Sequence, residues 1–347
     1  MVYYIVPALA FLGTLITYKR RWRDSSLYLW VLIVVIGLVL GMFRGEYIGQ
    51  DYVMYYFVFK GAYPAVEVGV MGLMDIMKSA GFHAFLGLVF MIAYLSKTYS
   101  FRKGSVDPFL SMMLYCSFWI LVYDFNGIRQ GLALGFCALS VMCMIKEKPK
   151  KWLYLATGSG ICCHYSMLVF VPILFLYNRR YNIKWIWIMV ILAFAVSAAG
   201  LPMRVIEIFV GDTNYYASKL VSYATNEEYN RNVIFSFSTI HRFLIFTVLM
   251  LVIPKMRLSG RFKRVFICGA FLSIFSYLIL ANVEIVATRG SLYFRFIEIF
   301  SLAAVPYYFR RKFNRIGVKI LLFLYVLSQI HATLSIPHGR LIPYTFI

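Results

Sequence analysis

The chain has 347 residues, of which 62% are hydrophobic and 14% charged, and its mean hydropathy is +0.76. A soluble domain carries roughly a quarter charged residues, so this composition excludes an ordinary soluble protein. The net charge of +21 would suit a nucleic-acid-binding protein, but 24 of the 35 Lys and Arg residues form six short clusters that apolar segments separate. We therefore expect a membrane protein with no nucleic-acid partner, whose basic clusters (19–23, 97–103, 146–151, 178–184, 255–264 and 310–319) face the cytoplasm.

Long continuous apolar runs follow one another along the chain and predict helices. A β-barrel would instead show ten-residue segments of alternating hydrophobicity. We expect a single all-α polytopic membrane domain over residues 1–347 with about ten transmembrane helices. The runs lie at about 2–18, 27–43, 82–96, 108–123, 127–145, 183–200, 233–253, 264–281, 293–309 and 316–334.

Residues 152–177 are apolar but have basic clusters on both sides. If this segment crossed once, one of these clusters and every later one would change sides. The pattern favours a re-entrant hairpin with its tip near His164, in which Gly158 and Gly160 permit the break and Pro172 interrupts the second arm. Both termini are then outside. The alternative is a single tilted span that departs from the charge rule.

Two longer segments fall on the predicted outer side. Residues 44–81 contain an amphipathic stretch, PAVEVGVMGLMDIMKSAGF, which we expect to lie along the membrane interface as a helix. Residues 201–232 carry seven charged side chains among several aromatic ones.

Several common chemistries have no signature in this sequence. There is no GxxxxGK[ST], GxGxxG, HExxH or GxSxG motif, and no DxD-like acidic pair for a sugar nucleotide. The six cysteines sit in apolar stretches without zinc-ligand spacing, and we interpret them as buried small side chains. We expect no cofactor, no metal and no nucleotide-activated donor.

Ionisable residues in or beside apolar segments are costly and therefore mark candidate sites. Under the topology above they all map to the outer half of the membrane, and basic groups dominate, which suits a phosphate or pyrophosphate ligand. Simpler explanations exist: Arg295 and Glu298 could pair on one helix, Arg44 and Asp51 could form a loop pair, Asp124 could cap a helix, and His164 could be an ordinary buried histidine. The candidates are Arg44, Glu46, Asp51, Asp124, Arg129, His164, His241, Arg242, Arg289, Arg295 and Glu298.

Five stretches, in this order, make the chain resemble the EpsG/Wzy-type polysaccharide polymerases. They are FRGEYIGQDYVMYY (43–56), FNGIRQGLALGF (125–136), CCHYSMLVFVP (162–172), RGSLYFRFIEIFSLAAVP (289–306) and IPYTF (342–346). The matching positions are Arg44, Gly49, Asp51, Tyr52, Tyr55, Asn126, Arg129, Gln130, His164, Arg289, Tyr293, Phe294 and Arg295.

The resemblance implies a nucleotide-independent glycosyltransferase in the bacterial cytoplasmic (inner) membrane. Such enzymes build O-antigen, capsule or exopolysaccharide at the outer face by joining repeat units carried on undecaprenyl pyrophosphate. The growing glycan moves to a new lipid-linked unit and undecaprenyl pyrophosphate is released. The implied partners are the lipid-linked donor and acceptor, membrane lipids and a chain-length regulator protein.

Roles for the candidate residues follow from this reaction. The pyrophosphate would bind to Arg129, Arg289 and Arg295, together with Arg242. A sugar hydroxyl needs a proton acceptor, for which His164 is our first candidate, because histidine titrates near neutral pH, and Asp51 the second; Glu46 and Asp124 also qualify. The remaining expected substrate contacts are Arg44, Asp124, Asn126, Gln130 and Tyr293.

Two other function classes remain open from the sequence. A transporter or flippase of a lipid-linked sugar would also use a broken helix near the midplane, but polar residues confined to the outer half do not favour alternating access. A membrane acyltransferase acting on polysaccharide would need a catalytic His or Ser near a thioester-binding surface. His164 is the candidate nearest to that role, and it faces the wrong side.

Overall fold

The computed structural model describes residues 2–16, 23–63, 67–201, 232–336 and 340–346, and helices joined by turns and loops make up these ranges. Within them the β pairing is one isolated bridge, between Arg44 and Phe346. A helix satisfies its own backbone hydrogen bonds, which is what an apolar environment requires. The predicted all-α class is confirmed, and each of the ten apolar runs coincides with a helix or a helical pair. Nearly all of the predicted outer segment 201–232 lies outside the described residues.

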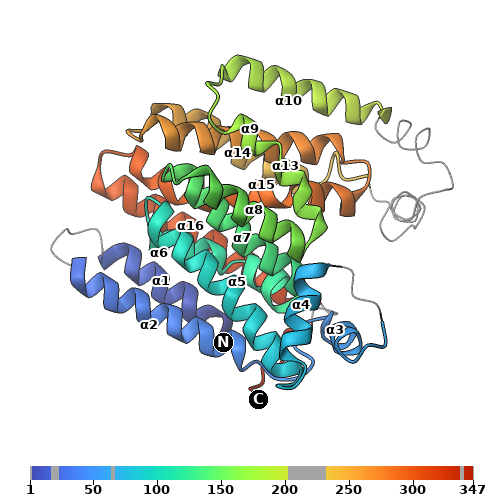
Figure 1. The fold of residues 1–347 in the computed structure, drawn as a ribbon. Coiled ribbons are helices and arrows are strands. Elements are labelled where there is room, and N and C mark those ends of the chain that lie inside the picture. The colour runs from blue at the N-terminus through green and yellow to red at the C-terminus, as the bar shows by residue number, and fades with distance from the viewer. Residues whose placement is uncertain (1, 17–22, 64–66, 202–231, 337–339, 347) are drawn as a thin grey trace. The chain divides into compact units, whose positions relative to one another are not determined.

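The chain divides into two compact units, residues 1–167 with 302–347 and residues 168–301 (Figure 1). Whether they act as one domain stays a prediction. The first unit contains α1 (Ile5–Ile16), α2 (Arg23–Met42), α3 (Tyr52–Phe59), α4 (Val68–Met77), α5 (Phe82–Gly104), α6 (Pro108–Tyr115), a π-helical turn (Ile120–Asn126), α7 (Ile128–Ile145), α8 (Lys150–Cys163) and α16 (Lys312–Leu334). The second contains α9 (Ile173–Leu176), α10 (Ile183–Ala198), α13 (Phe237–Val252), α14 (Gly260–Ile279) and most of α15 (Glu284–Ala304).

The predicted number of about ten spans is not confirmed. Five helices among the described residues are long and apolar enough to cross a membrane, at 82–104, 128–145, 237–255, 260–279 and 312–334. A sixth span is formed if α6 and the π-helical turn, which are bent by 68°, count as one broken span. Three of the other apolar runs form helices of 10 to 17 residues, such as Val2–Ile16 and Ile183–Ala198, which are shorter than a span. The remaining run lies in α15, which is not among the helices that are apolar enough to cross.

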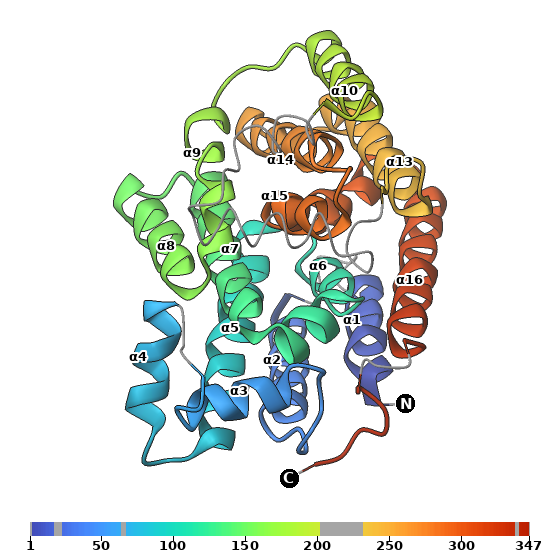
Figure 2. The same ribbon diagram turned by 90° about the vertical axis from the view of Figure 1, so that its right-hand side faces the viewer.

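Helices α5 and α7 pack against each other in the middle of the first unit, and α8 packs on α7 (Figure 2). Small side chains let them approach closely: a Cβ on Gly135 of α7 would lie 3.0 Å from the backbone of Ala93 on α5. On the other side of α7, Ser140 and Thr157 of α8 exchange a hydrogen bond of 3.1 Å. The 14 residues of α8 rise about 21 Å from the lysine-rich turn to His164.

The segment 152–177 breaks at His164, as its predicted tip requires. His164 has an extended backbone (φ −158°, ψ 115°) and ends α8. The proposed cause of the break was wrong, because Gly158 and Gly160 lie inside the continuous helix and Gly160 serves a close approach to Met167. Pro172 stands at the start of α9. The two arms belong to different units, so the re-entrant hairpin itself stays a prediction.

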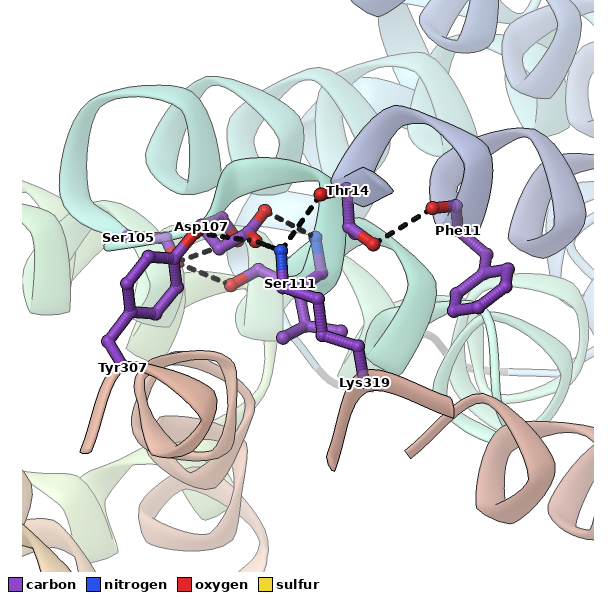
Figure 3. Close-up of polar contacts among 8 residues, drawn as sticks. Phe11, Thr14, Ser105, Asp107, Ser111, Tyr307 and Lys319 are labelled. Atoms are coloured by element: carbon purple, nitrogen blue, oxygen red, sulfur yellow. Dashed lines mark hydrogen bonds and ion pairs between the residues drawn. The ribbon is translucent and has the colours of Figure 1, made fainter. Parts of the chain in front are cut away.

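A buried ion pair joins the two sequence segments of the first unit, 1–167 and 302–347 (Figure 3). Lys319 of α16 donates to Asp107 at 2.8 Å and to the Thr14 carbonyl of α1 at 2.8 Å. Tyr307 also donates to Asp107, at 3.0 Å, and Asp107 caps α6 by accepting from the Leu110 amide. The ion pair thus has partners from three stretches that are far apart in sequence, at Thr14, at 107–110 and at 307–319, and both charged side chains are 2% exposed.

A second buried ion pair lies at the centre of the same unit. Lys97 of α5 donates to Asp124 at 2.5 Å and to the carbonyl of Gly131 at 2.7 Å, and the Tyr115 hydroxyl also donates to Asp124. Neither charged side chain is exposed. Lys97 therefore does not belong to an exposed cytoplasmic cluster, and Asp124 does not cap α7, whose N-cap residue is Gly127. Lys97 and Lys319, which the sequence places in basic clusters, are thus both paired with an acid inside the protein.

Candidate active site

Arg129 stands in the first turn of α7 and reaches toward α3 and the start of α4. Its Nη1 donates to Glu67 Oε2 at 2.6 Å, and its Nε donates to the Tyr55 hydroxyl at 3.4 Å. The guanidinium carbon lies 5.6 Å from the centroid of the Tyr55 ring, within cation–π range. Three kinds of contact therefore fix the plane of the guanidinium, while 28% of the side chain stays exposed.

Glu67 precedes α4 and connects Arg129 to His164. Its other oxygen, Oε1, lies 2.7 Å from His164 Nδ1, and the His164 Nε2 lies 3.3 Å from the Gln130 amide nitrogen. The carboxylate can reach α8 because α4 comes very close to it: a Cβ on Gly69 would lie 2.9 Å from the Cys162 carbonyl. The four side chains form one hydrogen-bonded chain, Arg129–Glu67–His164–Gln130.

A cavity of about 580 Å³ opens beside this chain of contacts. That volume is within the range of small-molecule sites. Helices α3 and α4, with Tyr63, supply most of the described wall, which is apolar and aromatic, and Arg129 and Glu67 are charged residues of its lining. Aromatic rings beside a few polar groups are suited to sugar rings. The described lining residues are Val53, Met54, Tyr55, Phe57, Val58, Tyr63, Glu67, Val70, Met74 and Arg129.

The loop before α3 docks onto residues 124–126. Arg44 donates to the Asp124 carbonyl at 2.9 Å and lies 5.3 Å from the Phe125 ring centroid. The Asp51 amide donates to the Asn126 side chain at 2.8 Å. Between them Gly49 has a positive φ (100°) and lies against the Phe125 carbonyl, so only glycine fits there. The two motifs, 43–56 and 125–136, thus form one structure.

The closing motif binds the same loop. The Gly45 amide donates to the Thr345 carbonyl at 2.6 Å, the Gly49 amide donates to the Arg340 carbonyl at 3.0 Å, and Arg44 pairs with Phe346. Arg44 is 4% exposed, and burial lowers the pKa of its guanidinium to about 10, so it stays protonated at neutral pH. We interpret Arg44 as the residue that holds this loop in place.

In the second unit, Arg242 and Arg295 gather with one acidic residue. Arg242 of α13 lies 3.9 Å from the Tyr277 ring centroid and donates to Ser291 of α15 at 3.0 Å. Both arginines are close enough to interact electrostatically with Glu298. Their combined charge remains positive, as an anion site requires.

The other two predicted residues of α15 are placed differently. Arg289 is exposed, and the six residues from it to Arg295 turn the helix so that they point roughly 120° apart. Tyr293 is fully buried. Arg242 and Arg295 are thus the two predicted arginines with shared neighbours on this unit, and a pyrophosphate site there stays a prediction.

The electrostatics of Glu67 lead to a prediction about pH. Burial alone would raise the pKa of this carboxyl, but hydrogen bonds from His164 and Arg129 and their charges outweigh it and lower the pKa below its ordinary 4.5. On acidification the unfolded chain takes up the proton first, so the stabilisation is complete above about pH 4.5 and is lost as the pH falls through the folded-state pKa. We expect the melting temperature of the wild type in detergent to fall more steeply than that of Glu67→Gln between about pH 5 and pH 3. Parallel curves would contradict this account.

The structure brings together five of the predicted residues in the first unit: Asp51, Asn126, Arg129, Gln130 and His164. Arg44 and Asp124 are buried beside them and do not border the cavity. Sequence reasoning missed Glu67, although an acid flanked by valines in the stretch PAVEVGV was a visible signal. Glu46 lies apart, in contact with the exposed His83 at 3.2 Å.

In the part of the chain that the structure describes, no three His, Cys, Asp or Glu side chains are grouped as metal ligands. No curated protein and no solved structure matches the chain significantly. The model of the EpsG family, however, matches residues 5–346, nearly the whole chain. This chain belongs to the EpsG family.

Proposed function

We propose that the protein polymerises oligosaccharide repeat units carried on undecaprenyl pyrophosphate, at the outer face of a bacterial cytoplasmic membrane. Family membership supports a polysaccharide polymerase in general. The observation that carries the finer proposal is the Arg129–Glu67–His164 chain at the edge of an aromatic cavity. Such a site offers a cation for a departing phosphate group, a proton acceptor for a hydroxyl and ring faces for sugars.

In this reaction the leaving group gains negative charge as its bond to the sugar breaks. Donors fixed in position before the reaction stabilise that charge without having to reorganise. Arg129 is such a donor in the first unit, and Arg242 and Arg295 are candidates in the second. An undecaprenyl chain requires a substrate site open to lipid, which suits a protein with several apolar helices long enough to span a membrane.

The direct test uses the substrate that accumulates when the enzyme is missing. Deleting the gene should abolish the long polysaccharide and leave single repeat units on their lipid carrier. Purified protein given this lipid extract should produce a ladder of longer glycans on a gel and release undecaprenyl pyrophosphate. Hydrolysing the extract to the lipid-free glycan is the control, because it removes the leaving group. A folded protein that forms no longer chains from the intact extract would overturn the proposal.

The orientation of the chain is part of the same proposal. The segment 340–346 pairs with the loop 43–49, so the two lie at the same end of the first unit. With the basic clusters in the cytoplasm, that end is outside. In a variant lacking its native cysteines, Thr345→Cys should react with a membrane-impermeant thiol reagent in intact spheroplasts, whereas Ser259→Cys should react only after lysis. Labelling of Ser259→Cys from outside would reverse the orientation.

A further inference from the structure

The carboxylates near the site differ in their access to the cavity. Asp124 is wholly enclosed in its ion pair with Lys97, and Glu46 lies in an exposed contact with His83. Neither of them, nor Asp51, belongs to the cavity lining. Glu67 does belong to it.

His164 was the first candidate for the proton acceptor, but its surroundings suit a supporting role better. It does not belong to the described lining of the cavity, and its Nδ1 points to Glu67 at 2.7 Å. Its other ring nitrogen lies 3.3 Å from the Gln130 amide nitrogen. Both nitrogens therefore already have protein partners, and one of these partners is the carboxylate on the cavity wall.

Glu67 is held as an ionised, oriented carboxylate by donors on both of its oxygens. Arg129 lies 2.6 Å from Oε2 and His164 lies 2.7 Å from Oε1. Each carboxylate oxygen has two lone-pair sites, so one donor on each leaves room for a further hydrogen bond. The pKa of Glu67 lies below its ordinary value, which keeps the carboxylate free of protons across the neutral range. A base of this kind is weak, but the hydroxyl it serves becomes acidic as its oxygen bonds to carbon.

We propose that Glu67 is the catalytic base, which takes the proton from the acceptor sugar's hydroxyl in this cavity, and that His164 is a positioning residue. This inference rests on the proposed function. The hydroxyl oxygen forms a bond to the anomeric carbon of the donor sugar. The bond from that carbon to the pyrophosphate oxygen breaks, and its electron pair leaves with undecaprenyl pyrophosphate. The hydroxyl proton goes to Glu67 and from there to water.

The test compares substitutions at Glu67 and His164 in the chain-growth assay. Glu67→Gln should lower kcat by about 10²–10⁴, the usual contribution of a general base, and Glu67→Asp should recover part of it. His164→Gln keeps an N–H donor for the carboxylate and should stay within about tenfold of the wild type. Asp75→Asn is the matched control, because Asp75 is an exposed carboxylate on α4 that does not line the cavity, and it should leave the rate unchanged.

The pH profile separates the two possible bases. With Glu67 as base, wild-type kcat stays level from about pH 7.5 to about pH 5.5, whereas a histidine base would lose activity below about pH 6.5. Full activity of a folded Glu67→Gln protein would overturn the inference. An inactive His164→Gln protein, together with a wild-type kcat that falls below about pH 6.5, would overturn it as well. Both results presuppose wild-type chain growth, so they leave the proposed function standing; a wild type that forms no polymer overturns that function instead.

Discussion

Replacing Arg129 by lysine is expected to lower the rate of polymer formation by about 10²–10³, the usual loss when one fixed charge-stabilising donor is removed. The guanidinium donates to Glu67 and to the Tyr55 hydroxyl, and its carbon lies within cation–π range of the Tyr55 ring. An ammonium group keeps the positive charge but has neither the plane nor the fork of donors, so it cannot hold these contacts and a phosphate group at once. The measurement is the initial rate of chain growth by purified protein at saturating lipid-linked substrate.

Arg311→Lys provides the matched control for this experiment. Arg311 is the exposed residue before α16, and its side chain does not cap the helix. Surface substitutions usually change the free energy of unfolding by less than about 0.5 kcal/mol. The same chemical change at Arg311 should therefore leave the protein folded and its rate within about twofold of the wild type. If Arg129→Lys polymerises as fast as Arg311→Lys, then Arg129 does not stabilise the leaving group.

Lys319→Met is expected to cost the protein about 3–5 kcal/mol of stability, because it leaves the Asp107 carboxylate buried without its cation. Asp107 and Lys319 are each 2% exposed, and the ion pair joins α16 to the start of α6 (Figure 3). The measurement is thermal unfolding of the purified protein in detergent. The effect on kcat should be small at temperatures where the variant stays folded, since neither residue lines the cavity.

A double variant separates the lost charge pair from lost packing. In Asp107→Asn/Lys319→Met both charges are gone, while the asparagine oxygen can still accept from the Leu110 amide. Removing both members of a buried pair is often nearly neutral, so the double variant should recover most of the loss. Lys103→Met, at an exposed lysine near the end of α5, should not change the melting temperature. A single Lys319→Met variant as stable as the wild type would show that the ion pair contributes nothing.

The positions of the helices could be predicted from the sequence because each depends on a local run of apolar residues. The span count could not be predicted, because it depends on breaks that are set by packing. Residues 108–123 are apolar throughout, yet the chain bends by 68° between α6 and the π-helical turn, where Asp124 turns inward to Lys97. Gly158 and Gly160 are predicted as helix breakers, but Gly160 instead allows the Met167 side chain to approach α8.

The candidate site was predictable in part, for a related reason. Arg129 and His164 stood out because ionisable residues are costly in apolar surroundings, whereas Gln130 was identified through the family resemblance. Their meeting point, Glu67, was not identified, because its partners are 62 and 97 residues away along the chain. Lys97 and Lys319 were assigned to surface clusters for the same reason: their acidic partners become neighbours only in the folded chain.

The pairing of Arg44 with Phe346 bears on when the protein matures during synthesis. Some 300 residues separate the two, and at about 5–20 residues per second the ribosome needs roughly 15–60 seconds to make them. During that time the loop 43–49 has already been made but lacks the backbone partners that Thr345 and Arg340 supply. A nascent chain can therefore already contain Glu67, Arg129 and His164 while the loop 43–49 is not yet held in place. A product that terminates before residue 340 would lack every one of these backbone partners of the loop.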